Sequence, residues 1–412
     1  MVSKIKKLID QLCTDGVEYR PLWQITIWDK RFNEVENYKQ PIVAKYKYLL
    51  AAELKALEVA SGDIKLLTTN NSDLWTTQNS TGDTPAEAEI IAIPWGGNPI
   101  IQYFNGKFFT ADNRIAIAKD EKELNMKYLY YFLCAKLDQI SEFYRGSGIK
   151  HPSMAKVLEF RIPVPPISIQ CEIVRILDKF TKLDSELEAE LKARERQYDF
   201  YRDQLLGFGN EGLKWAPFGD VATIVRGASP RPIQNFITDA VDGVPWVKIG
   251  DTVPGEKYLV STSQKITTEG AKNSRYISPG DFILSNSMSF GRPYISKIRG
   301  CIHDGWLSIS DFEKFLNADY LYHVLQSHAM QMEFSQRASN GTVSNLNADI
   351  VKSVRVPLPS LVEQARIAGV LNNFEIMLNS PVEGLPAEIK ARRQQYEYYR
   401  SKLLTFKELD VA

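Results

Sequence analysis

The sequence predicts an α+β (mixed α/β) protein in which two globular domains are separated by two long antiparallel coiled-coil helices. The chain repeats itself over a long period, and each repeat ends in a segment whose apolar residues recur at steps of three and four. Its length of 412 residues also exceeds what one hydrophobic core usually organises. We therefore expect a pseudo-two-fold internal repeat of domain and helix.

The repeat is clearest in the helical segments. Residues 191–208 match residues 389–406 at 10 of 18 positions, and residues 161–180 match residues 355–374 at 7 of 20. The offset between the copies grows from 194 to 198 residues, which places four extra residues within Ser380–Pro386. The predicted bounds alternate domain and helical segment: 1–160, 161–208, 209–354 and 355–412.

Each globular domain mixes strands with at least one helix. Short β-rich runs include Ala86–Pro94 in the first domain and Gly280–Ser285 in the second. A helical pattern begins near Asn125 and again near Asn317, and glycines and prolines mark the turns. This mixture indicates α+β domains.

The first helical segment predicts one long helix. Between Ser168 and Leu206 it would span about 58 Å at roughly 1.5 Å per residue. Three four-residue units place Leu183, Leu187 and Leu191 four apart, a stutter that locally unwinds a supercoil. The apolar positions that form the predicted seam are Ile169, Ile173, Ile176, Phe180, Leu183, Leu187, Leu191, Tyr198, Tyr201 and Leu205.

The second helical segment should be interrupted. Pro381, Gly384 and Pro386 should break the helix between its two apolar stretches. Because each leucine buried from water contributes about 1.5 to 3 kcal/mol, we expect the two segments to pack on each other. Antiparallel packing would put the two domains at opposite ends of a rod. The alternative is that each segment packs separately on its own domain.

Composition and charge exclude several classes of protein. The chain holds 50 Lys and Arg against 50 Asp and Glu, so its formal net charge is zero. Residues 1–160 hold 20 of each sign and residues 209–354 hold 14 of each. Phosphate attraction should therefore be weak unless the charges segregate by face or a partner supplies them. No long apolar stretch occurs, so we expect a cytoplasmic protein with no membrane contact.

Motifs for catalysis or metal binding are missing from the sequence. It contains no phosphate-binding loop, no dinucleotide-binding GxGxxG, no HExxH, no GxSxG and no adenine methyltransferase signature. The four cysteines lie far apart and predict reduced thiols. We expect each of the four histidines to be a structural or surface residue and not a catalytic one. We therefore predict no catalytic residue and no metal site.

The globular domains instead carry loops rich in Arg, Ser, Asn, Gly and aromatic residues, which are the residue types that contact phosphates and base edges. The alternative is that these loops are ordinary turns. The segments are 28–32, 94–99, 111–114, 144–152, 226–232, 285–293, 303–306 and 337–345.

The segments Ile162–Phe180 and Arg194–Phe208, together with the duplicated layout, resemble the specificity subunit of type I restriction-modification systems. The four-residue units around Glu186 and Glu190 are similar to the subgroup with short Leu-rich repeats in its central helix. The resemblance covers essentially the whole chain. It implies a non-catalytic subunit whose two target recognition domains each read one half of a bipartite, asymmetric sequence in double-stranded DNA.

The resemblance also implies partners and site residues. Two modification subunits would hold S-adenosylmethionine and methylate adenine, and restriction subunits would use ATP and Mg, so this chain itself would need no cofactor. The helices would set the spacer and dock the modification subunits through Tyr198, Tyr201, Arg202, Tyr396, Tyr399 and Arg400. The alternative for these six residues is that they only pack the helix pair. The residues expected to bind DNA are Lys30, Arg31, Trp95, Asn98, Asn113, Arg114, Arg145, Ser147, Lys150, His151, Arg226, Ser229, Arg231, Ser287, Ser289, Arg292, His303, Trp306, Asn340, Thr342, Ser344 and Asn345.

Two other functions remain open from the sequence. One is an autonomous DNA methyltransferase or nuclease with unrecognised motifs. The other is a purely structural coiled-coil scaffold.

Overall fold

The computed structural model describes residues 7–9, 11–80, 82–207, 212–286, 291–338, 346–380 and 382–409. The chain divides into two compact units, each mixing helices and strands. Unit 1 comprises Met1–Glu186 with Lys390–Ala412, and unit 2 comprises Leu187–Ile389. The predicted bounds 1–160 and 209–354 describe a different division, in which the helical segments stand apart from the domains.

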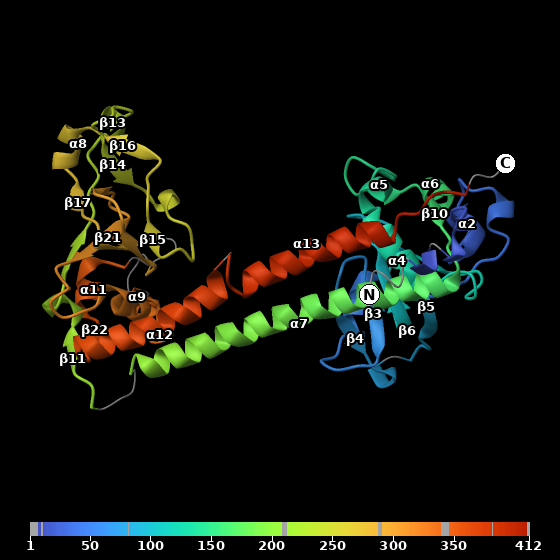
Figure 1. The fold of residues 1–412 in the computed structure, drawn as a ribbon, viewed down its shortest axis with the longest axis horizontal. Coiled ribbons are helices and arrows are strands. Elements are labelled where there is room, and N and C mark those ends of the chain that lie inside the picture. Colours follow the sequence, from blue (N-terminus) through green and yellow to red (C-terminus); the bar gives the residue numbers. More distant parts are fainter. Residues whose placement is uncertain are drawn as a thin grey trace. The chain divides into compact units, whose positions relative to one another are not determined.

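Unit 1 is built on a six-stranded sheet in the order β2-β7-β5-β6-β3-β4, visible in blue and cyan in Figure 1. Its strands are β1 (Tyr19–Pro21), β2 (Thr26–Trp28), β3 (Ile64–Leu67), β4 (Leu74–Thr76), β5 (Ala86–Pro94), β6 (Gln102–Thr110), β7 (Asn113–Ala118), β8 (Tyr144–Arg145), β9 (His151–Pro152) and β10 (Arg161–Pro163). Its helices are α2 (Leu22–Ile25), α3 (Ala51–Ala56), α4 (Met126–Ala135), α5 (Leu137–Ser141), α6 (Met154–Glu159), the first part of α7 (Ile167–Leu205) and most of α13 (Leu385–Leu403).

Unit 2 contains two five-stranded sheets, in the orders β12-β21-β18-β19-β15 and β13-β16-β14-β20-β17. Its strands are β11 (Trp215–Pro217), β12 (Thr223–Arg226), β13 (Ile237–Thr238), β14 (Val244–Val247), β15 (Tyr258–Leu259), β16 (Gln264–Ile266), β17 (Arg275–Ile277), β18 (Phe282–Ser285), β19 (Pro293–Ser296), β20 (Gly300–Ile302), β21 (Trp306–Ser310) and β22 (Arg355–Pro357). Its helices are α8 (Thr268–Lys272), α9 (Ala318–Gln326), α10 (His328–Ala338), α11 (Ala348–Ser353) and α12 (Leu361–Asn379), with the last part of α7.

Helices α4 and α9 begin where the sequence predicts them. The side chain of Asn125 accepts a hydrogen bond from the backbone N–H of Tyr128 at 3.0 Å, and Asn317 caps α9 through Tyr320 in the same way. Both helices bury an apolar face against the sheet of their own unit. The two predicted β-rich runs correspond to β5 and β18, so the α+β prediction is confirmed.

A buried glutamine holds the start of each long helix to its own domain. Gln170 of α7 accepts from the backbone N–H of Asn125 at 2.9 Å, and donates to the carbonyls of Glu123 and Pro165, both at 2.7 Å. Gln364 of α12 makes the equivalent three bonds to Asn317, Phe315 and Pro359. We call this arrangement the glutamine clamp. It fixes the correspondence between the two copies, because the bonded pairs repeat residue for residue.

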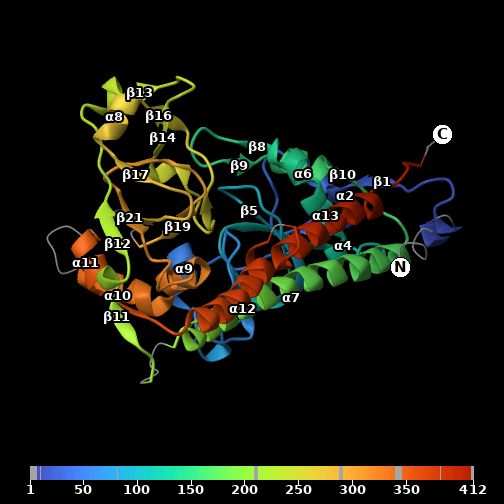
Figure 2. The ribbon, with the colours of Figure 1, turned by 60° about the vertical axis from the view of Figure 1, so that its left-hand side comes forward.

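Aromatic residues join the two helical segments within each unit. In unit 1 the ring of Phe180 lies 6.2 Å from that of Tyr396. In unit 2 the ring of Phe374 lies 6.3 Å from that of Tyr198, where the last part of α7 runs beside α12 (Figures 1 and 2). The expectation that the two helical segments pack on each other is confirmed. The alternative, in which each segment packs only on its own domain, is wrong.

The helices in unit 1 run antiparallel. Phe180 also contacts Tyr399, while Asp184, one turn further along α7, pairs with Arg393 of α13 at 2.9 Å. Residues further along α7 thus contact residues earlier in α13, which is the pattern of antiparallel helices. The predicted break in the second segment is confirmed as well, since α12 ends at Asn379 and α13 begins at Leu385. Pro381 lies outside the described residues.

Unit 1 is closed by the other end of the chain. The backbone N–H of Val17 donates to the carbonyl of Lys407 at 2.9 Å, and that of Leu409 donates to the carbonyl of Val17 at 2.9 Å. Arg161 adds an ion pair with Glu408. The segment after α13 is therefore part of the same unit as the first strand.

Candidate nucleic-acid interface

Unit 1 contains a cavity of about 500 Å³ beside the loop that follows β2. Four basic residues and one acidic residue, Glu34, stand in its lining, together with Trp95. The basic ones are Lys30, Arg31, Arg145 and His151. Five of the residues that the sequence predicts to bind DNA are thus brought together here.

Two buried side chains hold the loop after β2 in place. Asp29 donates its backbone N–H to the carbonyl of Ile115 at 2.9 Å, and its carboxylate accepts the N–H of Ile115 at 3.0 Å. Gln40 accepts from the N–H of Phe32 and donates to the carbonyl of Lys30, both at 2.9 Å. Sequence reasoning missed Gln40, which lies in an unpatterned segment and gives no signal of its role.

Trp95 forms an aromatic platform in the cavity. The guanidinium of Arg114 lies 4.4 Å from its ring centroid, and the ammonium of Lys30 lies 5.8 Å away. Nδ1 of His151 stands 2.7 Å from the carbonyl oxygen of Trp95. Because a carbonyl oxygen only accepts, Nδ1 carries a hydrogen and donates to it.

The hairpin formed by β8 and β9 brings basic residues to the same cavity. Arg145 pairs with His151 across the hairpin. Gly146 in its turn has φ = +133°, and a Cβ there would lie 2.6 Å from the carbonyl oxygen of Ile149. Only glycine fits this turn, which explains its place in the segment 144–152.

A buried ion pair lies beneath Trp95. One nitrogen of Arg114 lies 3.9 Å from Oδ2 of Asp29, and another lies 2.9 Å from Asp112. Burial raises the pKa of Asp29 to about 6, against the opposing effects of the Ile115 N–H and of Arg114. Oδ2 of Asp29 and Nε of Arg114 have no hydrogen-bond partner among the described residues.

Unit 2 contains a cavity of about 910 Å³ beside the loop that follows β12. Its lining includes Ser229, Arg231 and His303, which the sequence predicts to bind DNA, and also Trp246 and Lys248. It therefore combines cationic and aromatic side chains, as the cavity of unit 1 does.

Asp304 organises this second cavity. Its carboxylate accepts from the hydroxyl of Ser229 at 2.6 Å, a bond that lowers the pKa of Asp304, and lies 3.5 Å from Arg231. Its backbone carbonyl accepts from Nε of Arg226 at 3.0 Å and from the amide of Asn286 at 2.8 Å. The sequence singles out the segment 303–306 but not the role of Asp304 within it.

The two cavities occupy the same place in the repeat. Strand β2 pairs with β7 at the edge of its sheet, and β12 pairs with β21 in the same antiparallel manner. Each cavity is lined by the loop that follows this edge strand. Both copies of the repeat therefore place a cavity at the same loop.

Residues 35–194 and 210–391 both match the family described as the type I restriction modification DNA specificity domain. The chain belongs to this family. Together the two matches cover most of the chain, so the resemblance seen in the sequence is confirmed. The subgroup with Leu-rich repeats in the central helix stays a prediction.

Known relatives agree with this assignment. The EcoR124I/EcoR124II type I restriction enzyme specificity subunit of Escherichia coli is 31% identical over 74% of this chain and 76% of its own length. A putative type I specificity subunit of Haemophilus influenzae is 30% identical over 95% of this chain and 96% of its own. The solved S subunit from M. genitalium shares the fold, with a TM-score of 0.54, 13% identity, and coverage of 94% and 96%.

Specificity subunits of type I systems are non-catalytic, so an autonomous methyltransferase or nuclease is not favoured. Within the part of the chain that the structure describes, no group of three His, Cys, Asp or Glu side chains is placed to hold a metal ion. No helix among the same residues has the length and apolar character needed to cross a membrane.

Most of the DNA-binding residues expected of this specificity subunit are accessible. Trp95, Ser229 and His303 are half-buried. Those that are exposed are Lys30, Arg31, Asn98, Arg145, Ser147, Lys150, His151, Arg226, Arg231 and Arg292. Those that lie outside the described residues are Ser287, Ser289, Asn340, Thr342, Ser344 and Asn345.

The structure corrects the expectation for Asn113, Arg114 and Trp306, whose exposed fractions are 0%, 2% and 0%. The amide of Asn113 donates to the carbonyls of Leu67 and Thr68, both at 3.1 Å. Arg114 faces Asp29 inside unit 1, and Trp306 packs in an apolar cluster of unit 2. Buried and engaged in this way, the three side chains are not accessible to a base edge.

The residues expected to dock the modification subunits differ in how exposed their side chains are. Tyr198 and Arg202 are each 7% exposed, which favours the packing alternative for them. Tyr201 is 40% exposed, whereas the equivalent Tyr399 is half-buried, as are Tyr396 and Arg400. Phe200 and Tyr398, at equivalent positions of the repeat, are 59% and 54% exposed and were not singled out in the sequence.

Proposed function

We propose that this specificity subunit reads a bipartite, asymmetric sequence in double-stranded DNA, with one recognition domain on each half. The supporting observation is the repetition itself: two matches to a DNA-specificity domain, each with a basic and aromatic cavity at the equivalent loop. Because the two cavities are lined by different residues, the two halves of the sequence read should differ. An unread spacer would separate them.

The local charge supports DNA binding although the net charge is zero. The cavity in unit 1 is lined by Lys30, Arg31, Arg145 and His151 against Glu34, so basic groups gather at one place on a neutral domain. This is the segregation that phosphate binding needs. The exposed arginines of these loops would contact phosphates or guanine edges, and Asn98 would bond an adenine edge. The predicted loop residues outside the described ranges belong to the same proposal.

The helices would set the spacer and carry the partner subunits. Type I specificity subunits bind DNA and work in complexes with modification and restriction subunits. We propose that two modification subunits dock near the exposed Phe200, Tyr201 and Tyr398, one at each copy of the repeat. S-adenosylmethionine, ATP and Mg would belong to those partners and not to this chain.

The sequence read can be identified by methylome sequencing of a host that carries this chain with its modification subunits. The expected result is methylated adenines in a two-part asymmetric motif with a fixed unread gap. A continuous or palindromic motif would contradict the proposal. The purified chain alone, incubated with labelled S-adenosylmethionine and DNA, should transfer no label.

The role of the first cavity can be tested by Arg31→Ala and Arg145→Ala in the assembled methyltransferase. If each arginine contacts one phosphate, the slope of log affinity against log salt should become shallower by about 1 for each substitution. Lys122→Ala, which removes an exposed cation outside the cavity, is the control and should leave the slope unchanged. Unchanged slopes in both arginine variants would place the DNA elsewhere.

A further inference from the structure

A polar contact follows the glutamine clamp in each unit, where the recognition domain meets its helix. In unit 1 the ammonium of Lys127 on α4 lies 2.8 Å from Oδ2 of Asp178 on α7. The hydroxyl of Tyr131 donates to Oδ1 of Asp178 at 2.6 Å and lies 3.4 Å from the hydroxyl of Thr181. A carboxylate on the helix thus receives a cation and a hydroxyl from the domain.

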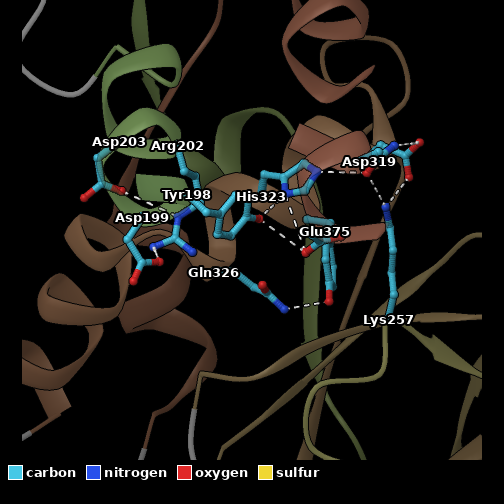
Figure 3. Close-up of polar contacts among 11 residues, drawn as sticks. Tyr198, Asp199, Arg202, Asp203, Lys257, Asp319, His323, Gln326 and Glu375 are labelled. Carbon is cyan, nitrogen blue, oxygen red and sulfur yellow. Dashed lines mark hydrogen bonds and ion pairs between the residues drawn. The ribbon is translucent and has the colours of Figure 1, made fainter. Parts of the chain in front are cut away.

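The equivalent contact in unit 2 is built from other residues. The amide of Asn372 on α12 donates to Oδ2 of Asp319 on α9 at 3.1 Å. The ammonium of Lys257 lies 2.8 Å from Oδ1 of Asp319, as Figure 3 shows, and donates to Oδ1 of Asn372 at 2.9 Å. The carboxylate here belongs to the domain, and the helix presents an amide.

His323 extends this contact to α7. Its Nε2 lies 2.9 Å from Oδ1 of Asn372, which only accepts, so Nε2 carries the hydrogen. The hydroxyl of Tyr198 donates to a carboxylate oxygen of Glu375 at 3.3 Å and lies 3.2 Å from Nδ1 of His323 (Figure 3). His323 is fully buried, and burial lowers its pKa to about 4, so the ring is neutral at neutral pH.

The glutamine clamp shows that these two contacts occupy equivalent positions. Lys127 and Asp319 each stand two residues after the asparagine that caps α4 or α9, and Asp178 and Asn372 each stand eight residues after the clamp glutamine. All four equivalent pairs differ in chemistry. They are Lys127 and Asp319, Tyr131 and His323, Asp178 and Asn372, and Thr181 and Glu375.

We propose that these residues form a matched set that makes α7 selective for the first recognition domain and leaves α12 able to hold either domain. Asp178 of α7 disfavours the second domain, because Asp319 would then face a carboxylate oxygen where the Asn372 amide now donates. Asn372 of α12 accepts either domain, since its carbonyl oxygen could receive Lys127 and Glu375 could receive Tyr131. The inference concerns assembly of the chain and goes beyond the DNA sequence it reads.

A double-mutant cycle in the full-length chain tests the set directly. Asn372→Asp places two carboxylates 3.1 Å apart and should lower the thermal midpoint of unit 2 by about 2–4 °C, the shift expected for roughly 1 kcal/mol in a domain of this size. Asp319→Asn should also lower it, since Lys257 loses its carboxylate. The reciprocal pair, Asp319→Asn with Asn372→Asp, restores an amide facing a carboxylate and should recover at least half of the loss. Additive losses, or no loss in Asn372→Asp, would overturn the proposal.

Domain grafts provide a second test. If Asn372 only stabilised α12, the Asn372→Asp substitution would have the same effect whichever domain packs on the helix. With residues 16–160 grafted in place of 212–354, Asn372→Asp should raise the thermal midpoint, because Lys127 then meets a carboxylate. In the natural chain the same substitution should lower it. With residues 212–354 grafted in place of 16–160, Asp178→Asn with Thr181→Glu should raise the midpoint. The same sign of the Asn372→Asp effect in both chains would overturn the proposal, and if a graft does not fold, the cycle in the natural chain decides. All readouts are thermal midpoints, so failure here is distinct from failure to read DNA.

Discussion

Asp29 is a buried carboxyl in unit 1, and its burial raises its pKa to about 6. Its backbone and side chain hold Ile115, and its second oxygen faces Arg114. The desolvation that raises its pKa is the larger effect, because Arg114 stands at 3.9 Å and does not donate to it with good geometry. The loop that carries Lys30 and Arg31 depends on this anchor.

Asp29→Asn should change how stability depends on pH. Between about pH 4 and pH 6 the folded protein retains a proton on Asp29 that the unfolded chain releases, so stability falls as the pH rises through this window. The variant lacks this proton. Its loss of stability relative to the wild type should therefore grow by up to about 3 kcal/mol as the pH is lowered from 7 to 4. Urea unfolding at pH 4.5 and pH 7 measures the difference.

The control for this prediction is Asp138→Asn, which replaces an exposed carboxylate in the same unit. Its effect on the free energy of unfolding should be small at both pH values. A loss for Asp29→Asn that stays constant with pH would show that the group is ionised throughout, as an ordinary aspartate is.

At the level of single residues, the sequence indicates which side chains lie in loops but not which of them are buried by distant contacts. Lys30, Arg31 and Arg145 lie in loops rich in the residue types that bind DNA, and they converge on one cavity. Arg114 looks the same in sequence, following a turn in a segment with an asparagine. Its burial is decided by Asp29, which is 85 residues away in the chain and gives no local signal.

At the scale of elements, the long helices are held to their domains by buried glutamines. The sequence shows that Gln170 and Gln364 correspond, but not what they do, because the groups they bind lie about 45 residues earlier in the chain. The seam was easier to predict, since burial of Ile169, Ile173 and Ile176 follows from spacing alone. The glutamine clamp gives hydrogen-bond partners to both the N–H₂ group and the oxygen of each side-chain amide. A glutamine can therefore be fully buried at these positions.

Gln170→Leu should destabilise unit 1 by about 3 kcal/mol or more. The substitution leaves one backbone N–H and two carbonyls without their partner, and each buried unsatisfied group costs about 1–3 kcal/mol. Chemical denaturation measures the loss. Gln139→Leu, at an exposed position of α5, should be close to neutral. An equally small effect at Gln170 would mean that water replaces the lost bonds.

At the scale of the whole molecule, most of the predicted domain organisation follows from the internal repeat. A sequence that repeats domain and helix predicts two units that each mix strands and helices, and Pro381, Gly384 and Pro386 predict the break before Leu385. The sharing of α7 between the two units could not, because periodicity locates a helix but not the point along it where packing changes partner. The backbone hydrogen bond between Val17 and Lys407 could not be predicted from the sequence either, since backbone bonds leave no residue pattern.

Lengthening α7 should lengthen the unread spacer of the DNA site. One further four-residue unit inserted after Lys192 would add about 6 Å to the helix, which at roughly 3.4 Å per base pair is close to two base pairs. Methylome sequencing of a host carrying the variant would show the new gap. Four residues inserted after Val241, which is 95% exposed in unit 2, should leave the gap unchanged. An unchanged gap in the Lys192 variant would refute the role of the helix as a spacer.

Because Lys390–Ala412 belongs to unit 1, the unit whose synthesis starts first is finished last. All of unit 2 is synthesised before Lys390, so unit 2 is complete before most of α13 exists. Until then Phe180 lacks Tyr396, and the backbone N–H of Val17 lacks the carbonyl of Lys407. Synthesis thus leaves unit 1 incomplete until the residues from Lys390 onward have been added, and a chain that stopped before Lys390 would contain unit 2 whole and unit 1 unfinished.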